Sequence, residues 1–435
     1  MLKMQKYVDL FFPGPILISE IAFSTKDRDS DGEMTPSKKE PMAYFLNPFH
    51  LSNSAFMMSY FNVGVGMNFL NIPVSFYLIT ALGISATQYS AYVALIGIPW
   101  SLKFIFGMIS DGNPIMKYRR KSWFTIGWTC FIAVNLFLAF SGSPSVTTII
   151  ISMFFMTCSY LLADVCTDTL AVERSRYEND SIRGCLQTSA YTIRSFGAVI
   201  GSLLGALLYN THTWGWGLNI NQCFLMSALI PMVTIGPVVL PLEELITSNK
   251  VPTVAQQICE IWRLLQLKAV YRTVGYIFFY GVFQVQNGAW ATFLLKGLKF
   301  TDFQFGILHV GGASLAYFGI VIYRQYFFET SWQKIYIYTT IMGSGFSLLQ
   351  IILILQYNRI IGIPDFYFAL GDTAAGAVLS AIQFMPSCIM FAMLCPEGSE
   401  GVSYAFLTTI ANLTASVAAD IGSAFTLMWD VSNDT

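Results

Sequence analysis

The chain has 435 residues, of which 54% are hydrophobic and only 11% are charged, and its formal net charge is −1. Soluble domains usually carry about 25% charged residues, so this composition argues against an ordinary water-soluble protein and favours a membrane protein. The nearly neutral balance gives no reason to expect a nucleic-acid partner.

The eight cysteines and three histidines are scattered singly through the chain. None of the cysteines falls in a C-x-x-C pair, and the sequence has no Cys/His spacing typical of a metal site. Motifs of serine hydrolases, zinc metalloproteases and phosphate-binding loops do not occur either. We therefore expect no metal, no cofactor and no enzymatic activity.

The first 50 residues are predicted to be a cytoplasmic tail that is partly disordered. Their apolar part, VDLFFPGPILISEIAF, contains Asp9, Glu20 and two prolines, which argues against both a signal peptide and a spanning helix. Residues 24–42 are rich in Ser, Pro and charge, which is typical of disordered segments.

Beyond this tail, apolar runs of membrane-spanning length recur along the chain. Such runs are too long and too uniformly apolar for the strands of a barrel, and only helices or closed barrels satisfy the backbone in lipid. The sequence therefore predicts an all-α polytopic membrane protein with about 11 spans. We place the runs at 56–80, 88–110, 122–141, 146–170, 184–209, 219–241, 271–295, 303–323, 335–356, 366–394 and 401–429.

The positions of Lys and Arg predict the topology. Loops after the second, fourth, sixth and eighth runs contain 13 Lys and Arg, whereas loops on the other side contain 3. Cytoplasmic loops carry the excess of positive charge. We therefore expect the basic loops and the N-terminus in the cytoplasm of a multi-pass integral membrane protein, and we favour the plasma membrane over an organelle.

The longest loop divides the chain into two halves. Residues 51–241 are predicted to form a six-helix bundle, and residues 271–435 a C-terminal bundle whose last helix is apparently absent. The linker between them, 242–270, contains VAQQICEIWRLLQL, whose apolar spacing predicts an amphipathic helix at the membrane surface. Two parallel halves of this kind match the plan of major-facilitator-like transporters with two bundles.

Four ionisable side chains fall inside predicted spans of the first half. A charge at a helix centre costs about 2.5 to 3.5 kcal/mol on insertion scales, so these side chains must face the bundle interior. Asp164 and Asp168 are four residues apart and share one helix face, where close carboxylates could carry a proton. The functional interpretation is a binding and coupling site; the alternative is an ion-paired network that only holds helices together. The four are Lys103, Asp164, Asp168 and Arg194.

The seventh run carries the polar patch QVQNGAW. Its amides and indole could hydrogen-bond to and stack on a heteroaromatic ligand, or the glutamines could simply seal a contact between helices. The candidate residues are Gln284, Gln286, Asn287 and Trp290. In the fifth run, the G-x-x-x-G repeat Gly197, Gly201 and Gly205 predicts close helix packing.

Lys103, Gly107 and Asp111 share one face of the second run, and a basic group from Lys117 to Lys121 follows. We expect this basic group to be a solvated topological signal that does not touch substrate. The pattern from Gly107 through Asp111 to Arg119 and Arg120 resembles the loop between helices 2 and 3 of major facilitator transporters. The usual signature has Arg four residues after the Asp, whereas Arg119 comes eight after Asp111.

Five blocks together resemble the folate–biopterin transporter family, over most of residues 55–425. They are PWSLKFIFGMISD, PIMKYRRKSW, ADVCTDTLAVERSR, QTSAYTIRSFGAVIG and CPEGSEGVSYAFL. The resemblance implies carriage of folates or pterins, driven by protons, in a family whose members usually have twelve spans. It also implies that Gly107, Asp111, Arg119 and Arg120 form a gating loop.

Folate joins a flat pterin to an acidic tail, which suggests roles for the intramembrane residues. Lys103 and Arg194 could hold its carboxylates, and Asp164 and Asp168 could carry the coupling proton. Amide and aromatic side chains would take the ring. Two alternatives stay open, namely a carrier for another metabolite such as S-adenosylmethionine, and a transport-inactive receptor or scaffold. The oligomeric state is not predicted.

Overall fold

The computed structural model describes residues 50–428, with gaps at 85, 179–183, 210–214, 240–241, 243, 245–251, 286–289, 291–292, 301 and 397–398. The predicted tail, apart from its last residue, lies outside the described residues. So do Gln286 and Asn287 of the predicted polar patch.

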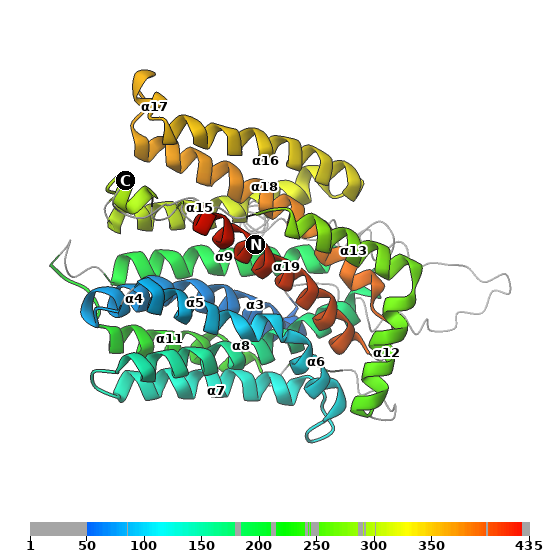
Figure 1. Ribbon diagram of the computed structural model, residues 1–435. Helices are drawn as coiled ribbons and strands as arrows, with labels where there is room; N and C mark the ends of the chain where they lie inside the picture. Colours follow the sequence, from blue (N-terminus) through cyan, green and yellow to red (C-terminus); the bar gives the residue numbers. More distant parts are fainter. Residues whose placement is uncertain are drawn as a thin grey trace, which may run out of the picture.

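The described residues form long helices that run side by side, with one helix lying across an end of the molecule (Figure 1). The crossing helix is α12, so we call this end the α12 end and the opposite one the α4 end. The α-helices are α3 (Leu51–Phe69), α4 (Asn71–Phe76), α5 (Ala86–Ser101), α6 (Lys103–Gly112), α7 (Lys121–Phe140), α8 (Val146–Ser175), α9 (Cys185–Leu208), α11 (Ile220–Thr234), α12 (Val254–Gln266), α13 (Lys268–Val282), α15 (Asp302–Ile322), α16 (Trp332–Ile354), α17 (Tyr357–Ile360), α18 (Asp365–Leu394) and α19 (Glu400–Met428). Short π-helical turns cover Tyr77–Ala81, Phe293–Gly297 and Tyr323–Phe327, and a 3-10 turn covers Gly236–Val238.

Seven helices in the described part of the chain are long and apolar enough to cross a membrane. They correspond to predicted runs 3, 4, 5, 8, 9, 10 and 11. The described residues of the other four runs lie mostly in shorter or interrupted helices, such as α5 and α6, which meet at Leu102. Pro99 lies inside α5 and has no backbone N–H to continue the hydrogen-bond ladder. The predicted all-α polytopic membrane fold is confirmed.

Small residues bring α3 and α9 into close contact. A Cβ at Gly201 would lie 2.7 Å from the Val65 carbonyl oxygen, and one at Gly205 would lie 2.6 Å from the Phe69 carbonyl oxygen. The backbones can approach this closely only because both positions lack a side chain. The predicted packing role of the glycine repeat is confirmed, and the contact fixes the segment of α9 that carries Arg194.

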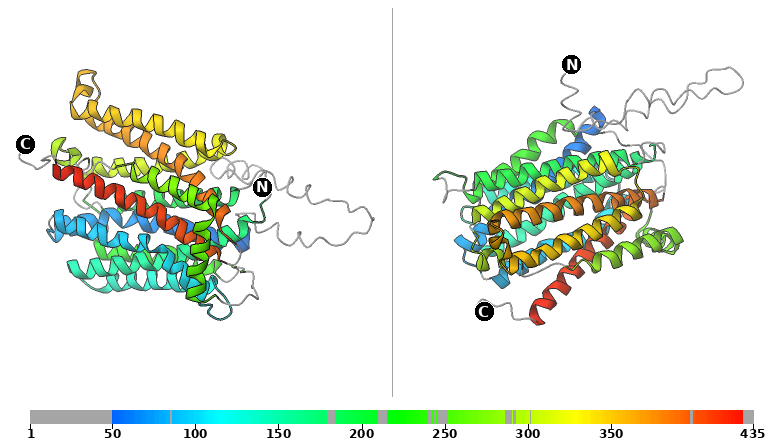
Figure 2. Two further views of the ribbon diagram at one scale, coloured as in Figure 1. Left: turned by 45° about the vertical axis from the view of Figure 1, so that its right-hand side comes forward. Right: turned by 90° about the horizontal axis from the view of Figure 1, so that it is seen from above.

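The ribbon views show how the halves of the chain meet (Figures 1 and 2). Helices α7, α8 and α11 lie on one side of the molecule, and α16 and α18 lie on the other. Between these two groups, α9 packs against α15, and α6 packs against α19. Side chains near the middle of α6, α8 and α9 therefore lie close to the boundary between the halves.

The crossing helix α12 begins with a capping box made by Thr253 and Gln256. The Gln257 amide donates to the Met108 carbonyl oxygen at 3.3 Å, which holds α12 against the end of α6. Three apolar side chains, Val254, Ile258 and Trp262, stay more than half exposed. An exposed apolar stripe of this kind suits the surface of a bilayer.

Candidate functional site

The four intramembrane charges of the first half meet in one cluster, which we call the charged cluster. The Lys103 ammonium donates to Asp164 Oδ2 at 2.7 Å and to Asp168 Oδ2 at 2.6 Å. The Arg194 guanidinium donates to Asp164 Oδ1 at 3.1 Å. Helices α6, α8 and α9 each supply part of the cluster, and Asp164 joins the two cations.

Tyr60 of α3 completes the cluster. Its hydroxyl donates to Asp168 Oδ1 at 2.7 Å, so both oxygens of this carboxylate have a partner. The side chain is fully buried. The sequence gives no sign of this role, because one tyrosine among 22 carries no signal that separates it from a packing residue.

The charged cluster is sealed from solvent except at one member. Lys103 is 3% exposed and Asp164 is fully buried, whereas the Arg194 side chain keeps 14% of its surface exposed. Two positive and two negative charges cancel, which is how buried charges are tolerated in a spanning region. Arg194 is therefore the member that a ligand can reach first in this conformation.

Aromatic rings surround the two cations. The Trp100 ring centroid lies 5.7 Å from Lys103 Nζ and 5.6 Å from Arg194 Cζ. The Tyr191 ring centroid lies 5.8 Å from Arg194 Cζ. Cations at this distance from ring faces gain electrostatic stabilisation, most of all where water is excluded. The rings therefore help to hold both cations in place.

The second half of the chain holds a neutral counterpart, which we call the amide network. Gln383 of α18 donates to the Tyr280 hydroxyl at 2.6 Å and to Thr339 Oγ1 at 2.7 Å. Its Oε1 accepts from Gln284 Nε2 at 3.3 Å. Of the predicted polar patch, Gln284 joins this network. Trp290 instead stacks on Phe293, with ring centroids 5.7 Å apart, in an apolar cluster.

A second group of charges lies at the α12 end, beyond the charged cluster. Arg120 pairs with Asp111 and donates to Glu173 Oε1 at 3.1 Å. Asp111 in turn accepts from the backbone N–H of Val402 in the other half, at 2.7 Å. Our expectation of a solvated basic loop is wrong for Arg119 and Arg120, which are 9% and 2% exposed. The fold brings two carboxylates to Arg120.

The rest of the predicted gating loop lies around this group. A Cβ at Gly107 would lie 2.8 Å from the Gly401 carbonyl oxygen, so α6 and α19 approach backbone to backbone here. The backbone N–H groups of Arg119 and Arg120 both donate to Glu244 Oε1, at 2.8 and 3.1 Å. The described contacts therefore tie this loop to both halves of the chain.

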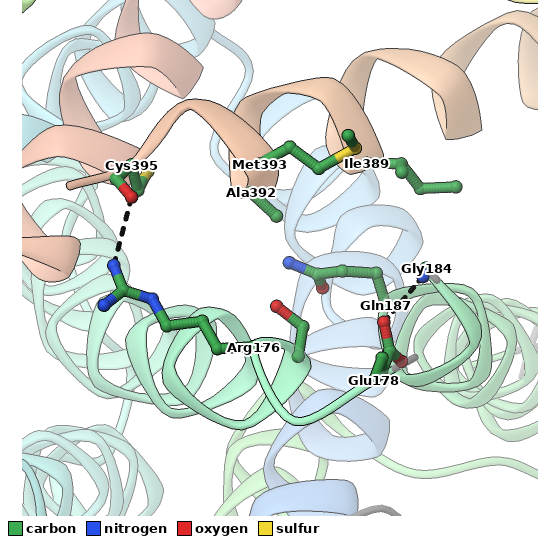
Figure 3. Close-up of a pocket in the computed structure, with 9 residues that line it drawn as sticks. Arg176, Glu178, Gly184, Gln187, Ile389, Ala392, Met393 and Cys395 are labelled. Atoms are coloured by element: carbon green, nitrogen blue, oxygen red, sulfur yellow. Dashed lines mark hydrogen bonds between the residues drawn. The ribbon is translucent and has the colours of Figure 1, made fainter. Parts of the chain in front are cut away.

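A second contact joins the halves at the α12 end. Arg176 pairs with Glu400 at 2.8 Å and donates to the Cys395 carbonyl oxygen at 3.0 Å. Next to it lies a cavity of about 220 Å³, bounded by the ends of α8 and α18 and the start of α9 (Figure 3). Gln187 points into this space, and neither of its amide atoms has a hydrogen-bond partner among the described residues.

Comparison with known proteins places the chain in a family of transporters. A family model described as the BT1 family matches residues 63–435. A folate-biopterin transporter of Synechocystis is 29% identical over 384 residues, which cover 86% of this chain and 74% of the relative. Folate transporter 1 of Plasmodium falciparum is 24% identical, over 79% of this chain and 66% of the relative.

Two solved structures share the fold. A Major Facilitator Superfamily transporter, FucP, in the outward conformation matches with a TM-score of 0.61 and 13% identity, over 88% of this chain and 92% of that chain. A bacterial homologue of the iron transporter ferroportin, in an outward-facing state, matches with a TM-score of 0.59, 13% identity, and coverage of 86% and 92%. At identities this low, the two matches establish a shared fold and nothing about function.

These matches agree with the resemblance that the five sequence blocks carry. The fold is that of major facilitator transporters, and the expectation of a transporter rather than an enzyme is confirmed by the family. The family match covers most of the residues that form both halves and includes Lys103, Asp164, Asp168 and Arg194. The chain belongs to the BT1 family.

Proposed function

We propose that this chain is a secondary active transporter that carries folates or pterins across a membrane by alternating access between its two halves. The charged cluster is the single observation that carries the proposal. Balanced charges buried in spanning helices are costly and usually mark a substrate or ion pathway. The names of the relatives, which are folate and folate-biopterin transporters, favour this substrate class.

Arg194 is the proposed first contact for the acidic tail of a folate. Its side chain is partly exposed and makes one ion pair, at 3.1 Å to Asp164. A guanidinium presents five donors in a planar fork that matches a carboxylate. The flat ring would then lie toward Tyr191 and the amide network, which includes the predicted Gln284. Gln286 and Asn287 lie outside the described residues. Trp290, which stacks on Phe293, is not proposed as a ring contact.

Lys103 and the two aspartates are proposed to couple the substrate to a proton. Both ion pairs of Lys103 are shorter than 3 Å and buried, so its charge is already balanced. An arriving carboxylate adds one negative charge that the cluster cannot neutralise as it stands. A proton on Asp164 or Asp168 would restore the balance and free Lys103 for the substrate. Substrate and proton would therefore enter together.

The conformation described here is proposed to open away from the cytoplasm. The contacts of Asp111 with Val402 and of Arg176 with Glu400 join the halves at the α12 end. The loops at this end carry most of the Lys and Arg, which favours a cytoplasmic location for them and for the N-terminus. The charged cluster would then be reached from the α4 end. We keep the plasma membrane as the proposed location.

A counterflow assay with the purified chain in lipid vesicles tests the function. Labelled folate should exchange with unlabelled folate or biopterin, and Arg194→Ala should abolish the exchange while the protein stays folded, because the carboxylate loses its fork-shaped partner. Thermal unfolding of the solubilised variant checks the fold. Exchange with S-adenosylmethionine but with no folate or pterin would replace the substrate class. Exchange with nothing in the panel would favour a receptor or scaffold.

A further inference from the structure

The break between α5 and α6 lies directly beside Lys103. In a continuous helix the Phe104 N–H would donate to the Trp100 carbonyl oxygen, four residues earlier. At Leu102 the backbone leaves the helical region, with φ −112° and ψ 16°. The Phe104 N–H and the Trp100 carbonyl are thereby separated, and each needs another partner inside the protein.

Both freed groups find that partner on α19, in the other half of the chain. The Phe104 N–H donates to Thr409 Oγ1 at 3.1 Å, and the Trp100 carbonyl accepts from Asn412 Nδ2 at 3.3 Å. Thr409 and Asn412 are three residues apart and share one face of α19. One lost hydrogen bond within the second span is thus replaced by two bonds between the halves.

These two bonds enclose the part of the backbone that sets the charged cluster. Lys103 lies between the two bonded residues and reaches Asp164 and Asp168 from the break. The Trp100 side chain lies against the cations of Lys103 and Arg194. A change in the backbone here would move the lysine ammonium and the indole together.

We propose that Thr409 and Asn412 are positioning residues, which hold the helix break open and so place Lys103 for the substrate carboxylate. The proposal rests on the transport function proposed above. When α19 moves away from α5 and α6, the Phe104 N–H and the Trp100 carbonyl can bond to each other instead. The helix then becomes continuous and Lys103 turns relative to its carboxylates. The placement of Lys103 in the charged cluster thereby depends on the position of the second half.

The first test compares two substrates in the counterflow assay. Thr409→Val removes the acceptor at nearly constant volume, and we expect it to raise KM for folate about tenfold. KM for a pterin without a carboxylate should change less than about twofold, since Lys103 acts on the acidic tail. Thr409→Ser, which keeps the hydroxyl, should restore the wild-type KM. Equal losses for both substrates would contradict the proposal, because a merely structural role affects both.

The chain offers a matched control in the neighbouring residue. The Thr408 hydroxyl donates to the Tyr404 carbonyl oxygen of its own helix, at 2.9 Å, and makes no described bond to α5 or α6. Thr408→Val should leave KM for both substrates unchanged. Asn412→Leu should act in the same direction as Thr409→Val. The double variant should be little worse than the more impaired single variant, because either change frees the same break.

A second test does not depend on the substrate. We would measure the unfolding temperature of Thr409→Val in the natural chain and in a Lys103→Met and Asp168→Asn background, which lacks one charge of each sign. The loss of unfolding temperature should be at least halved in that background, because the lysine is no longer there to be positioned. Equal losses in both would overturn the proposal. A chain that exchanges no folate or pterin would sink the proposed function, and this cycle would still decide the positioning role.

Discussion

The first half of the chain buries a cluster of ions, whereas the second half groups partly exposed neutral amides with hydroxyls in its amide network. In the charged cluster both ion pairs of Lys103 end on a carboxylate, at 2.7 Å or less. In the amide network Gln383 bonds to a phenol, a hydroxyl and another amide. Ions hold a site together strongly and can exchange a proton, but neutral groups bind a flat polar ring without changing charge. The difference suggests that the acidic tail and the ring of one substrate are recognised by different halves.

A short aromatic path connects these two regions. Tyr191 lies against Arg194, and its ring centroid is 5.0 Å from that of Phe384. Phe384 follows Gln383 directly in α18. The Tyr191 hydroxyl also lies 3.4 Å from that of Tyr404 in α19. Movement of either half would therefore shift the Tyr191 ring that packs against Arg194.

The largest effect is expected from Asp164→Ala. Asp164 balances Lys103 and Arg194 together, so its removal leaves buried positive charge without a partner. Breaking a buried ion pair in this way costs about 3 to 5 kcal/mol of stability. Thermal unfolding of the solubilised protein measures the loss. Asp372→Asn in the second half is the matched control, since Asp372 is paired only with the neutral Gln350 amide among the described contacts. Similar losses of stability in both variants would contradict the view that only the first half depends on buried ion pairs.

A smaller effect is expected from Arg194→Lys, which keeps the charge but loses the planar fork. Folate should bind about tenfold more weakly, which corresponds to about 1.4 kcal/mol, whereas a pterin without a carboxylate should be unaffected. The ratio of KM values in the counterflow assay measures this. A matching loss for the pterin would mean that Arg194 does not read the acidic tail.

Gln383→Leu should give the opposite pattern. The substitution removes the centre of the amide network. The binding of folate and of pterin should each weaken by about fivefold, which corresponds to a loss of roughly 1 kcal/mol of hydrogen bonding. Gln350→Leu is the control, because the described partner of Gln350 is Asp372 and not a member of the amide network. If Gln383→Leu weakened the binding of folate much more than that of the pterin, the second half would recognise the acidic tail and not the ring.

The smallest effect is expected at the α12 end. Arg176→Gln breaks a partly exposed pair with Glu400, worth roughly 0.2 to 1 kcal/mol, and should loosen the contact between the halves. Alkylation of Cys395, in a chain whose other cysteines are replaced, should speed up about two- to fivefold. Arg359→Gln, which breaks the pair with Asp365 near the α4 end, should leave that rate unchanged. If Arg359→Gln sped up the alkylation of Cys395 and Arg176→Gln did not, the α12 end would not be the closed side.

The helical fold and the residues of the charged cluster could both be predicted from the sequence, for one physical reason. A charge inside an apolar run must be paired, so the run positions of Lys103, Asp164, Asp168 and Arg194 already require these side chains to face inward. The length of the apolar runs alone was also enough to locate most of the spanning helices.

The rest of the site depends on contacts that no local pattern records. Tyr60, Trp100 and Gln383 are ordinary members of apolar helices, and tertiary packing alone brings them to a charge or to one another. At the helix break, the Phe104 N–H donates to Thr409, 305 residues later in the chain. A cluster of cations likewise indicates a solvated loop until the fold supplies carboxylates for one of them.

Proton movement driven by folate tests the central claim most directly. Vesicles containing the purified chain and a pH-sensitive dye are given a folate gradient with no imposed pH gradient. The account predicts that folate carries protons with it in the natural chain, and that Asp164→Asn or Asp168→Asn abolishes the proton signal but keeps folate exchange. Folate transport without any proton movement in the natural chain, or an unchanged proton signal in both Asp164→Asn and Asp168→Asn, would contradict the coupling role of the charged cluster.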